Sequence, residues 1–172
     1  MRRLACLTSI TLFACATLAA TVTGQQRDQE ATAIPGRTVW DGVYTEEQAR
    51  RGCTEYMRAC ASCHAEDLRG NGTAPSLVEE SFSFLYGDTP VGELLDRIRT
   101  QMPQDRPGSL SGQSYRDIVA FILQSNKLPA GERELDADPE ALRQVLITTK
   151  RPGPEPQSAS VPAARPADRC GK

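Results

Sequence analysis

The sequence predicts an all-α fold, and three observations support that prediction. Apolar residues recur at helical spacing in several segments, residues that favour helix N-termini precede those segments, and no run of alternating apolar and polar residues is long enough for a strand. No internal repeat is present. A chain of 172 residues suits one domain with about 100 to 120 residues in its core.

The N-terminus has the layout of a secretory signal. Two arginines are followed by an apolar run and then by small residues, and polar sequence resumes after Gly24. The apolar run is too short for a membrane span, so residues 1–24 are predicted to be removed on export, with Ala19 or Ala20 as other cleavage sites. Acylation of Cys15 is a lesser alternative, because the residues before it fit a lipoprotein box poorly.

Both flanks of the domain are expected to lack regular structure. Residues 25–44 are mostly polar and form a predicted extended arm, whose Trp40 should pack on the domain. Residues 150–172 are rich in proline, serine and alanine and form a predicted disordered tail. The domain itself is therefore expected over residues 45–149.

The charge of the chain is unevenly distributed. The formal net charge is −2, although residues 1–24 carry two arginines without an acid and the tail is net basic. The domain is therefore acidic, which argues against nucleic acid and anionic membranes as partners and mildly favours a partner with a basic docking face. Ordinary solubility charge explains the same composition equally well.

The first core helix is predicted to begin after Thr45, which forms a capping box with Gln48. Apolar residues at helical offsets make one face of this helix, with Gly52 among them. A glycine in mid-helix costs about 1 kcal/mol relative to alanine, and the usual reason to keep it is the close approach of another helix. We expect that partner to be the helix that begins after Ser111.

Two further helices are predicted from their first residues. Thr89 and Pro90 begin a helix that reaches about Thr100, and Asp138 with Pro139 begin a last short one. The residues expected to be buried by the helices after Thr89, Ser111 and Asp138 are Val91, Leu94, Leu95 and Ile98; Tyr115, Ile118, Val119 and Ile122; and Leu142, Val145 and Leu146.

The run Cys60-Ala61-Ser62-Cys63-His64 is a C-x-x-C-H motif, and His64 is the single histidine of the chain. This motif is the attachment signature of c-type haem. Two intervening residues let both thiols of one helical turn reach the two vinyl groups of one porphyrin, while the adjacent imidazole faces the iron. Cys60, Cys63 and His64 are therefore predicted to bind one haem c, which together with the secretory signal indicates the periplasm.

Other uses of these cysteines fit the sequence less well. A thioredoxin-like redox pair requires a βαβ setting, which the sequence does not contain, and a zinc site with paired histidines is excluded by the single histidine. A four-cysteine zinc site that adds Cys53 and Cys170 stays open despite its poor spacing. In an oxidising compartment Cys53 and Cys170 form a disulfide or remain free thiols, and the sequence leaves both alternatives open.

The segments after the motif supply the rest of the predicted site. Residues 65–77 are rich in turn formers and predict a loop over one haem edge. The second ring nitrogen of His64 needs an acceptor, and the candidate is a backbone carbonyl near Pro75. Residues 82–86 include two phenylalanines and a tyrosine, and they are expected to form a short helix or turn that lines the haem pocket.

Met102 is the candidate sixth ligand of the iron. Met1 is removed with the signal, and Met57 lies on the helix that already delivers the haem cysteines. Pro103 follows Met102 directly and would stiffen the loop that carries it. The alternative role for Met102 is core filling, which is the commoner role of methionine.

The order and spacing of several motifs over residues 45 to 130 resemble those of a class I c-type cytochrome. These motifs are Gly52-x-x-x-Tyr56 before the C-x-x-C-H run, Ala74-Pro75-x-Leu77, Met102-Pro103, and Tyr115-x-Asp117-Ile118-Val119-Ala120-Phe121-Ile122. The segments 40–45 and 102–111 are further similar to small periplasmic cytochromes found beside PQQ-dependent dehydrogenases. The departures are Ala65, where glycine usually follows the histidine, and Cys53 within the first helix.

The resemblance implies a cytochrome c class I fold in which the first and last core helices cross at Gly52 and loops wrap one covalently bound haem. It implies His64 and Met102 as axial ligands and the Pro75 carbonyl as the partner of His64. The implied role is to carry single electrons, not enzymatic catalysis, with redox proteins and possible PQQ-dependent dehydrogenases as partners. The protein is expected to be a monomer without a membrane span. The alternatives are a haem enzyme or gas-binding sensor with an open sixth position, and a cytochrome subunit docked permanently on a dehydrogenase.

Overall fold

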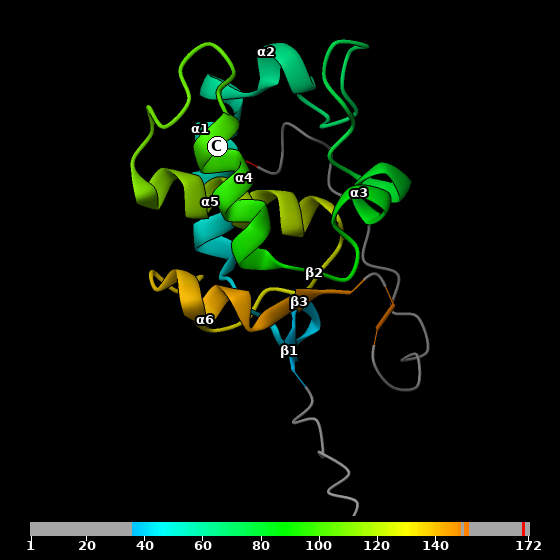
Figure 1. Cartoon of the computed structure of the whole chain (residues 1–172), viewed down its shortest axis with the longest axis vertical. Helices are drawn as coiled ribbons and strands as arrows, with labels where there is room; N and C mark the ends of the chain where they lie inside the picture. The colour runs from blue at the N-terminus through cyan, green and yellow to red at the C-terminus, as the bar shows by residue number, and fades with distance from the viewer. Residues whose placement is uncertain (1–35, 149, 152–169, 171–172) are drawn as a thin grey trace, which may run out of the picture. The chain divides into compact units, whose positions relative to one another are not determined.

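The computed structural model describes residues 36–148, 150, 151 and 170. The predicted signal and most of the predicted arm and tail lie outside these residues. Within them the chain is mainly helical, as predicted (Figure 1). The helices are α1 (Glu46–Ala59), α2 (Ala61–His64), α3 (Glu79–Tyr86), α4 (Val91–Gln101), α5 (Gly112–Ser125) and α6 (Pro139–Arg143), with a 3-10 helix η1 (Val39–Asp41) before them.

The predicted N-caps of three helices are present. The side chains of Thr45, Ser111 and Asp138 each accept a hydrogen bond from a backbone amide in the first turn of α1, α5 and α6. The capping box at α1 is only half formed, which corrects the prediction. The Gln48 side chain is fully buried, and its Oε1 accepts a hydrogen bond of 2.8 Å from the Leu135 amide. Gln48 therefore joins α1 to the segment that follows α5.

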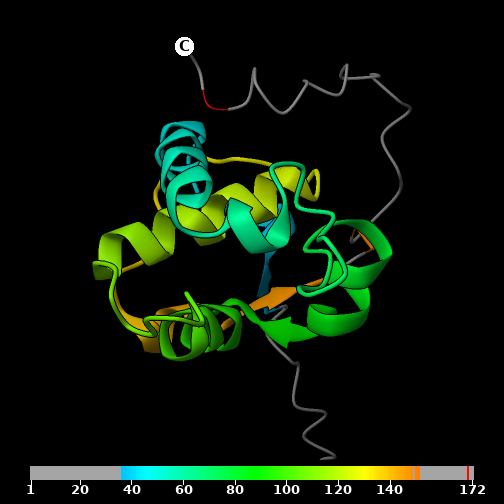
Figure 2. The same ribbon diagram turned by 90° about the horizontal axis from the view of Figure 1, so that it is seen from above.

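Helices α1 and α5 cross at Gly52, as predicted. A Cβ at Gly52 would overlap the backbone carbonyl of Asp117, so only glycine allows this approach. One turn further along α1, the ring of Tyr56 packs against Phe121 with 5.3 Å between their centroids. Figure 2 shows α1 and α5 together on one side, with α4 and α6 on the other.

An ion pair joins α1 and α5 beside the crossing. The Arg51 guanidinium donates two hydrogen bonds of 3.0 Å to the carboxylate of Asp117, whose side chain is only 5 % exposed. Glu134 accepts a third bond from Arg51, and Gln113 donates to Asp117. The hydrogen bond with Asp117 raises the pKa of the Arg51 guanidinium, so Arg51 keeps its charge in the folded protein.

A small sheet, which the sequence did not predict, ties the ends of the domain together. Strands β1 (Arg37–Thr38), β3 (Val145–Ile147) and β2 (Thr89–Pro90) lie in that order, with β1 parallel and β2 antiparallel to β3. The predicted helix start at Thr89 is therefore wrong, because Thr89 and Pro90 pair with β3 and Val91 is the first helical residue. Strands of two or three residues are too short to show an alternating pattern.

Two predictions of buried residues also need correction. Helix α6 ends at Arg143, and the residues after it alternate along β3. Leu146 is therefore 37 % exposed, while its neighbour Ile147 is buried. In the predicted pocket segment, α3 forms as expected and buries Phe82, but Phe84 is 89 % exposed.

The described end of the predicted arm packs on the domain. The indole Nε1 of Trp40 donates a hydrogen bond of 2.9 Å to the Thr148 carbonyl, which confirms the expected packing of this residue. Val39, Val43 and Tyr44 are buried in the same core. None of the helices in the described part of the chain is long and apolar enough to cross a membrane.

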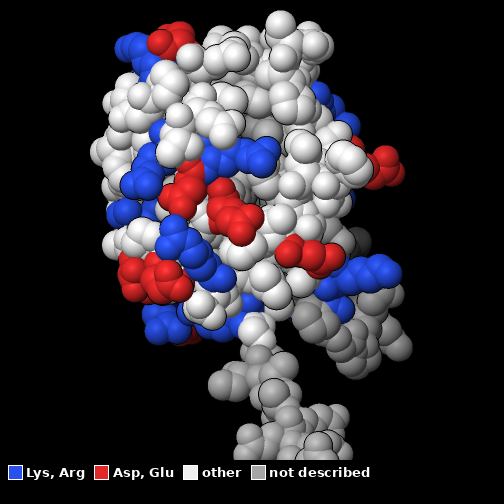
Figure 3. Space-filling view, viewed as in Figure 1, with Lys and Arg blue, Asp and Glu red and all other residues white. Residues whose placement is uncertain are grey.

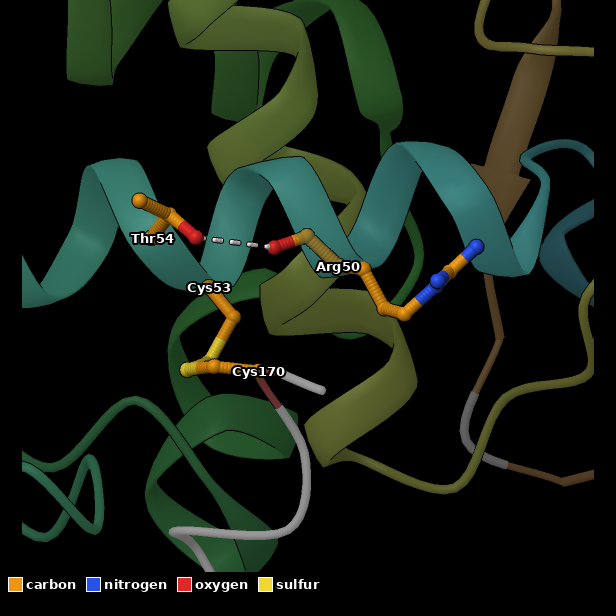
Figure 4. The surroundings of a disulfide bond; sticks show 4 residues. All are labelled: Arg50, Cys53, Thr54 and Cys170. Carbon is orange, nitrogen blue, oxygen red and sulfur yellow. Dashed lines mark hydrogen bonds between the residues drawn. A yellow bond between two sulfur atoms is a disulfide. The ribbon is translucent and has the colours of Figure 1, made fainter. Parts of the chain in front are cut away.

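A disulfide between Cys53 and Cys170 decides the alternative that the sequence left open. Figure 4 shows Cys170 against α1, with its sulfur bonded to that of Cys53. The bond closes a loop across 117 positions of the sequence. Both cysteines are therefore occupied, and the four-cysteine zinc site is not formed.

Candidate haem site

The C-x-x-C-H motif folds into one helical turn directly after α1. The amides of Cys63 and His64 both donate hydrogen bonds to the Cys60 carbonyl, at 3.1 and 2.9 Å. Cys60 and Cys63 are the free cysteines among the described residues, with Cys60 half-buried and Cys63 exposed. Burial raises the pKa of the Cys60 thiol to about 11. Two unpaired thiols and an imidazole therefore lie on a single turn.

His64 is held in one orientation by the backbone. Its ring is only 8 % exposed, and Nδ1 lies 3.0 Å from the Pro75 carbonyl oxygen. The predicted hydrogen bond between these groups is therefore present. A carbonyl can only accept, so Nδ1 is the donor, and in the neutral imidazole Nε2 keeps its lone pair. This tautomer is the one that a metal-ligating histidine needs.

The loop over residues 65–77 brings Pro75 back to His64. The Gly70 amide donates to the His64 carbonyl at 2.9 Å, and the Leu77 amide donates to the Leu68 carbonyl at 2.7 Å. Gly70 has a φ of +75° and lies so close to the Ala74 carbonyl that a Cβ would overlap it. The loop is therefore closed by its own backbone, without a regular element.

Tyr56 connects this loop to α1. Its hydroxyl donates a hydrogen bond of 2.7 Å to the carbonyl of Ala65, the residue directly after His64. The ring is buried, and burial raises the pKa of the phenol well above its usual range. The hydroxyl therefore stays protonated and remains a donor at physiological pH.

Met102 lies at the C-terminal end of α4 and is half-buried. Its amide donates to the Ile98 carbonyl at 2.9 Å, and its own carbonyl accepts a hydrogen bond of 2.9 Å from the Tyr115 hydroxyl. The described residues contain no hydrogen bond between Met102 and the turn Cys60–His64. The structure therefore unites Cys60, Cys63, His64 and Pro75 directly, and it places Met102 on a separate helix.

These side chains fit a covalently attached haem. The free thiols suit thioether formation, the oriented imidazole offers one ring nitrogen to iron, and a methionine thioether is a further known haem ligand. The sequence placed Tyr115 in an apolar stripe and in the last motif of the resemblance, but neither pattern predicted a role for its hydroxyl near this set. A tyrosine in an apolar stripe could have indicated this role, because a buried hydroxyl normally has a hydrogen-bond partner.

Other features of the surface do not compete with this site. A cavity of about 300 Å³ lies between α3 and α4 and is lined by Leu85 and Tyr86, but by none of the predicted site residues.

On the face in Figure 3, acidic and basic side chains are interspersed, and the upper part, where Figure 1 places α2, is largely uncharged. The part of the chain that the structure describes contains no cluster of three His, Cys, Asp or Glu residues able to hold a metal ion.

Residues 47–122 match the family model described as "Cytochrome C oxidase, cbb3-type, subunit III". No curated protein and no solved structure matches the chain. The matched range includes α1, the C-x-x-C-H turn, α4, Met102 and most of α5. The match supports a c-type cytochrome domain in this region, and such a domain implies a covalently bound haem c and an electron-transfer role.

Proposed function

We propose that this protein is a periplasmic monohaem cytochrome that carries single electrons between a dehydrogenase and a downstream acceptor. The cytochrome c domain over residues 47–122 supports the electron-transfer role. The single C-x-x-C-H motif and the single histidine of the chain support one haem, and the N-terminal signal supports export. The observation that carries the proposal is the His64 ring, whose Nδ1 is engaged by Pro75 while Nε2 is left for iron.

The residues of the turn divide the binding of haem between them. The thiols of Cys60 and Cys63 would hold haem through thioether bonds to its two vinyl groups and so would fix it to the turn Cys60–His64. His64 would offer Nε2 to the iron, while the Pro75 carbonyl maintains its tautomer and raises its basicity. When bound, haem supplies reversible one-electron chemistry between ferrous and ferric iron.

Met102 completes the coordination in this proposal. A thioether sulfur stabilises the ferrous state and so raises the reduction potential. If His64 and Met102 both bind the iron, no position would be left open for a substrate. The chain also has no second histidine to act on a distal ligand. These features favour a carrier over a haem enzyme or a gas sensor.

A second candidate is a cytochrome subunit docked permanently on a dehydrogenase or another redox enzyme. The description of the matching family names an oxidase subunit, and Phe84 presents an almost fully exposed aromatic ring on α3. The two candidates differ in one simple measurement. A docked subunit co-purifies with its enzyme at high salt, whereas a carrier elutes as a free monomer.

The test of the carrier compares two methionine variants of the mature holoprotein. The wild-type ferric spectrum should contain the far-red sulfur-to-iron charge-transfer band. Met102→Ala should abolish this band, lower the reduction potential and allow CO to bind the ferrous form. The matched control is Met57→Ala, which removes the half-buried methionine of α1 and should leave all three properties unchanged. A Met102→Ala variant with the wild-type spectrum would show that Met102 is not the ligand.

A further inference from the structure

The Tyr115 hydroxyl bonds to both ends of the loop over residues 102–110. Tyr115 lies in the first turn of α5 and is 1 % exposed. Its hydroxyl donates to the Met102 carbonyl at 2.9 Å and accepts a longer hydrogen bond of 3.4 Å from the Leu110 amide. A single buried group therefore closes the loop that begins with Met102.

The loop has little other attachment to the domain. Its internal hydrogen bonds run from the Arg106 amide to the Pro103 carbonyl and from the Ser109 amide to the Arg106 carbonyl. Residues 104–109 are exposed. Among the described residues, Tyr115 is the one side chain outside the loop that hydrogen-bonds to it. Beyond the end of α4, the Tyr115 hydroxyl is therefore the side-chain hydrogen-bond partner that holds the Met102 backbone.

Tyr115 is itself fixed by the helix crossing. Two residues further along α5, the Asp117 carbonyl lies against Gly52 of α1. Helix α1 leads directly into the turn that carries Cys60, Cys63 and His64. The phenol is therefore attached to the same rigid pair of helices that positions the haem-binding turn. A hydroxyl supported in this way can set where Met102 lies relative to that turn.

We propose that Tyr115 is a positioning residue for the sixth ligand: its hydroxyl holds the Met102 loop closed and so keeps the thioether on the iron. This inference rests on the proposed function, because it assumes ligation by Met102. It assigns to one hydroxyl group an effect on ligand exchange, which a purely structural tyrosine would not have. Without the hydroxyl, the loop opens more readily and an external ligand replaces Met102 more easily.

The test uses two Tyr→Phe variants of the mature holoprotein. Tyr115→Phe removes the bonds to Met102 and Leu110. The matched control, Tyr44→Phe, removes an equally buried hydroxyl that donates to the Leu128 carbonyl at 2.5 Å, away from the Met102 loop. The readouts are the far-red sulfur-to-iron band of the ferric protein and the affinity of ferric iron for imidazole.

Tyr115→Phe should weaken the band and tighten imidazole binding about five-fold, the factor that one net hydrogen bond corresponds to. Tyr44→Phe should leave both readouts at the wild-type values, even where its thermal stability falls as much. Equal imidazole affinities in the two variants, with the wild-type band intact, would overturn the role of Tyr115 but not ligation by Met102. A wild-type protein without the band would instead overturn Met102 ligation, and this inference with it.

Discussion

His64 and Met102, the two residues proposed as iron ligands, are supported by contacts of different kinds. The His64 ring bonds to Pro75, its carbonyl accepts from Gly70, and the next carbonyl accepts from Tyr56. All of these partners lie within a dozen residues of His64 along the chain. Beyond the last turn of α4, the backbone of Met102 instead bonds to one side chain from α5, the Tyr115 hydroxyl.

Because the two residues are supported differently, substitutions near His64 and near Met102 should have different effects. On the His64 side, the haem-binding turn follows directly on α1, the helix that crosses α5 and carries the disulfide at Cys53. Changes there should lower the free energy of unfolding or prevent haem binding. On the Met102 side, changes should alter the sixth ligand while the fold persists. The variants below test this separation, from the largest expected effect to the smallest.

Removing both attachment points should have the largest effect. A Cys60→Ala, Cys63→Ala double variant should contain no covalent haem and should lose most of its native helicity, because the porphyrin is expected to fill a large part of the core of a chain with few aromatic residues. Far-UV circular dichroism measures the outcome. Each single variant keeps one thiol and serves as an intermediate control. Full native helicity in the double variant without haem would show that the fold is independent of the cofactor.

Removing the disulfide should be the next largest effect. Cys170→Ser opens a loop that spans 117 positions, and the chain-entropy model gives a loss of about 5 kcal/mol for a loop of this length. The measurement is guanidinium unfolding of the holoprotein. Wild-type protein treated with a reductant should unfold at the same midpoint as the variant. The far-red band of folded Cys170→Ser should match the wild type, and a changed band would contradict the separation of the two sides.

Gly52→Ala should destabilise the protein by about 3 kcal/mol, because the new methyl group would overlap the Asp117 carbonyl at the α1–α5 crossing. The matched control is Gly112→Ala. The nearest atom to a Cβ there is the tip of the flexible Arg116 side chain at 3.6 Å, so this variant should be neutral or slightly more stable. Equal unfolding midpoints for both variants would show that the helices do not approach as closely as described.

The features of this fold that the sequence predicted correctly are local ones. Gly52 in mid-helix, the caps at Thr45, Ser111 and Asp138, and the C-x-x-C-H turn all depend on local patterns, and each was placed correctly. The bond between His64 and Pro75 was also expected, because a ligand imidazole needs an acceptor.

The missed features depend on contacts between distant residues. Gln48 is well suited to a capping box, yet its side chain bonds to Leu135, 87 positions away. Thr89 and Pro90 pair with β3 instead of starting a helix. In α3 the eight residues are too few for periodicity to decide which aromatic ring faces inward, and Phe84 is exposed. The bond from Tyr115 to Met102 likewise becomes visible only when α5 is placed beside the end of α4.

The ion pair beside the crossing should give the smallest effect of the series. Arg51→Met leaves the Asp117 carboxylate buried without its cation and should cost about 2 kcal/mol. Glu134→Gln is the control, since this carboxylate is 43 % exposed and its variant should cost less than about 1 kcal/mol. Thermal unfolding of both holoproteins measures the difference. An Arg51→Met variant as stable as wild type would remove this pair from the support of the His64 side.

Mass analysis of the mature protein, produced in a host with working haem-attachment machinery, tests the central claim most directly. The intact protein should carry the mass of one haem, and after digestion that mass should remain on the peptide that contains Cys60, Cys63 and His64. A colourless protein whose Cys60 and Cys63 both react with an alkylating reagent would contradict the account.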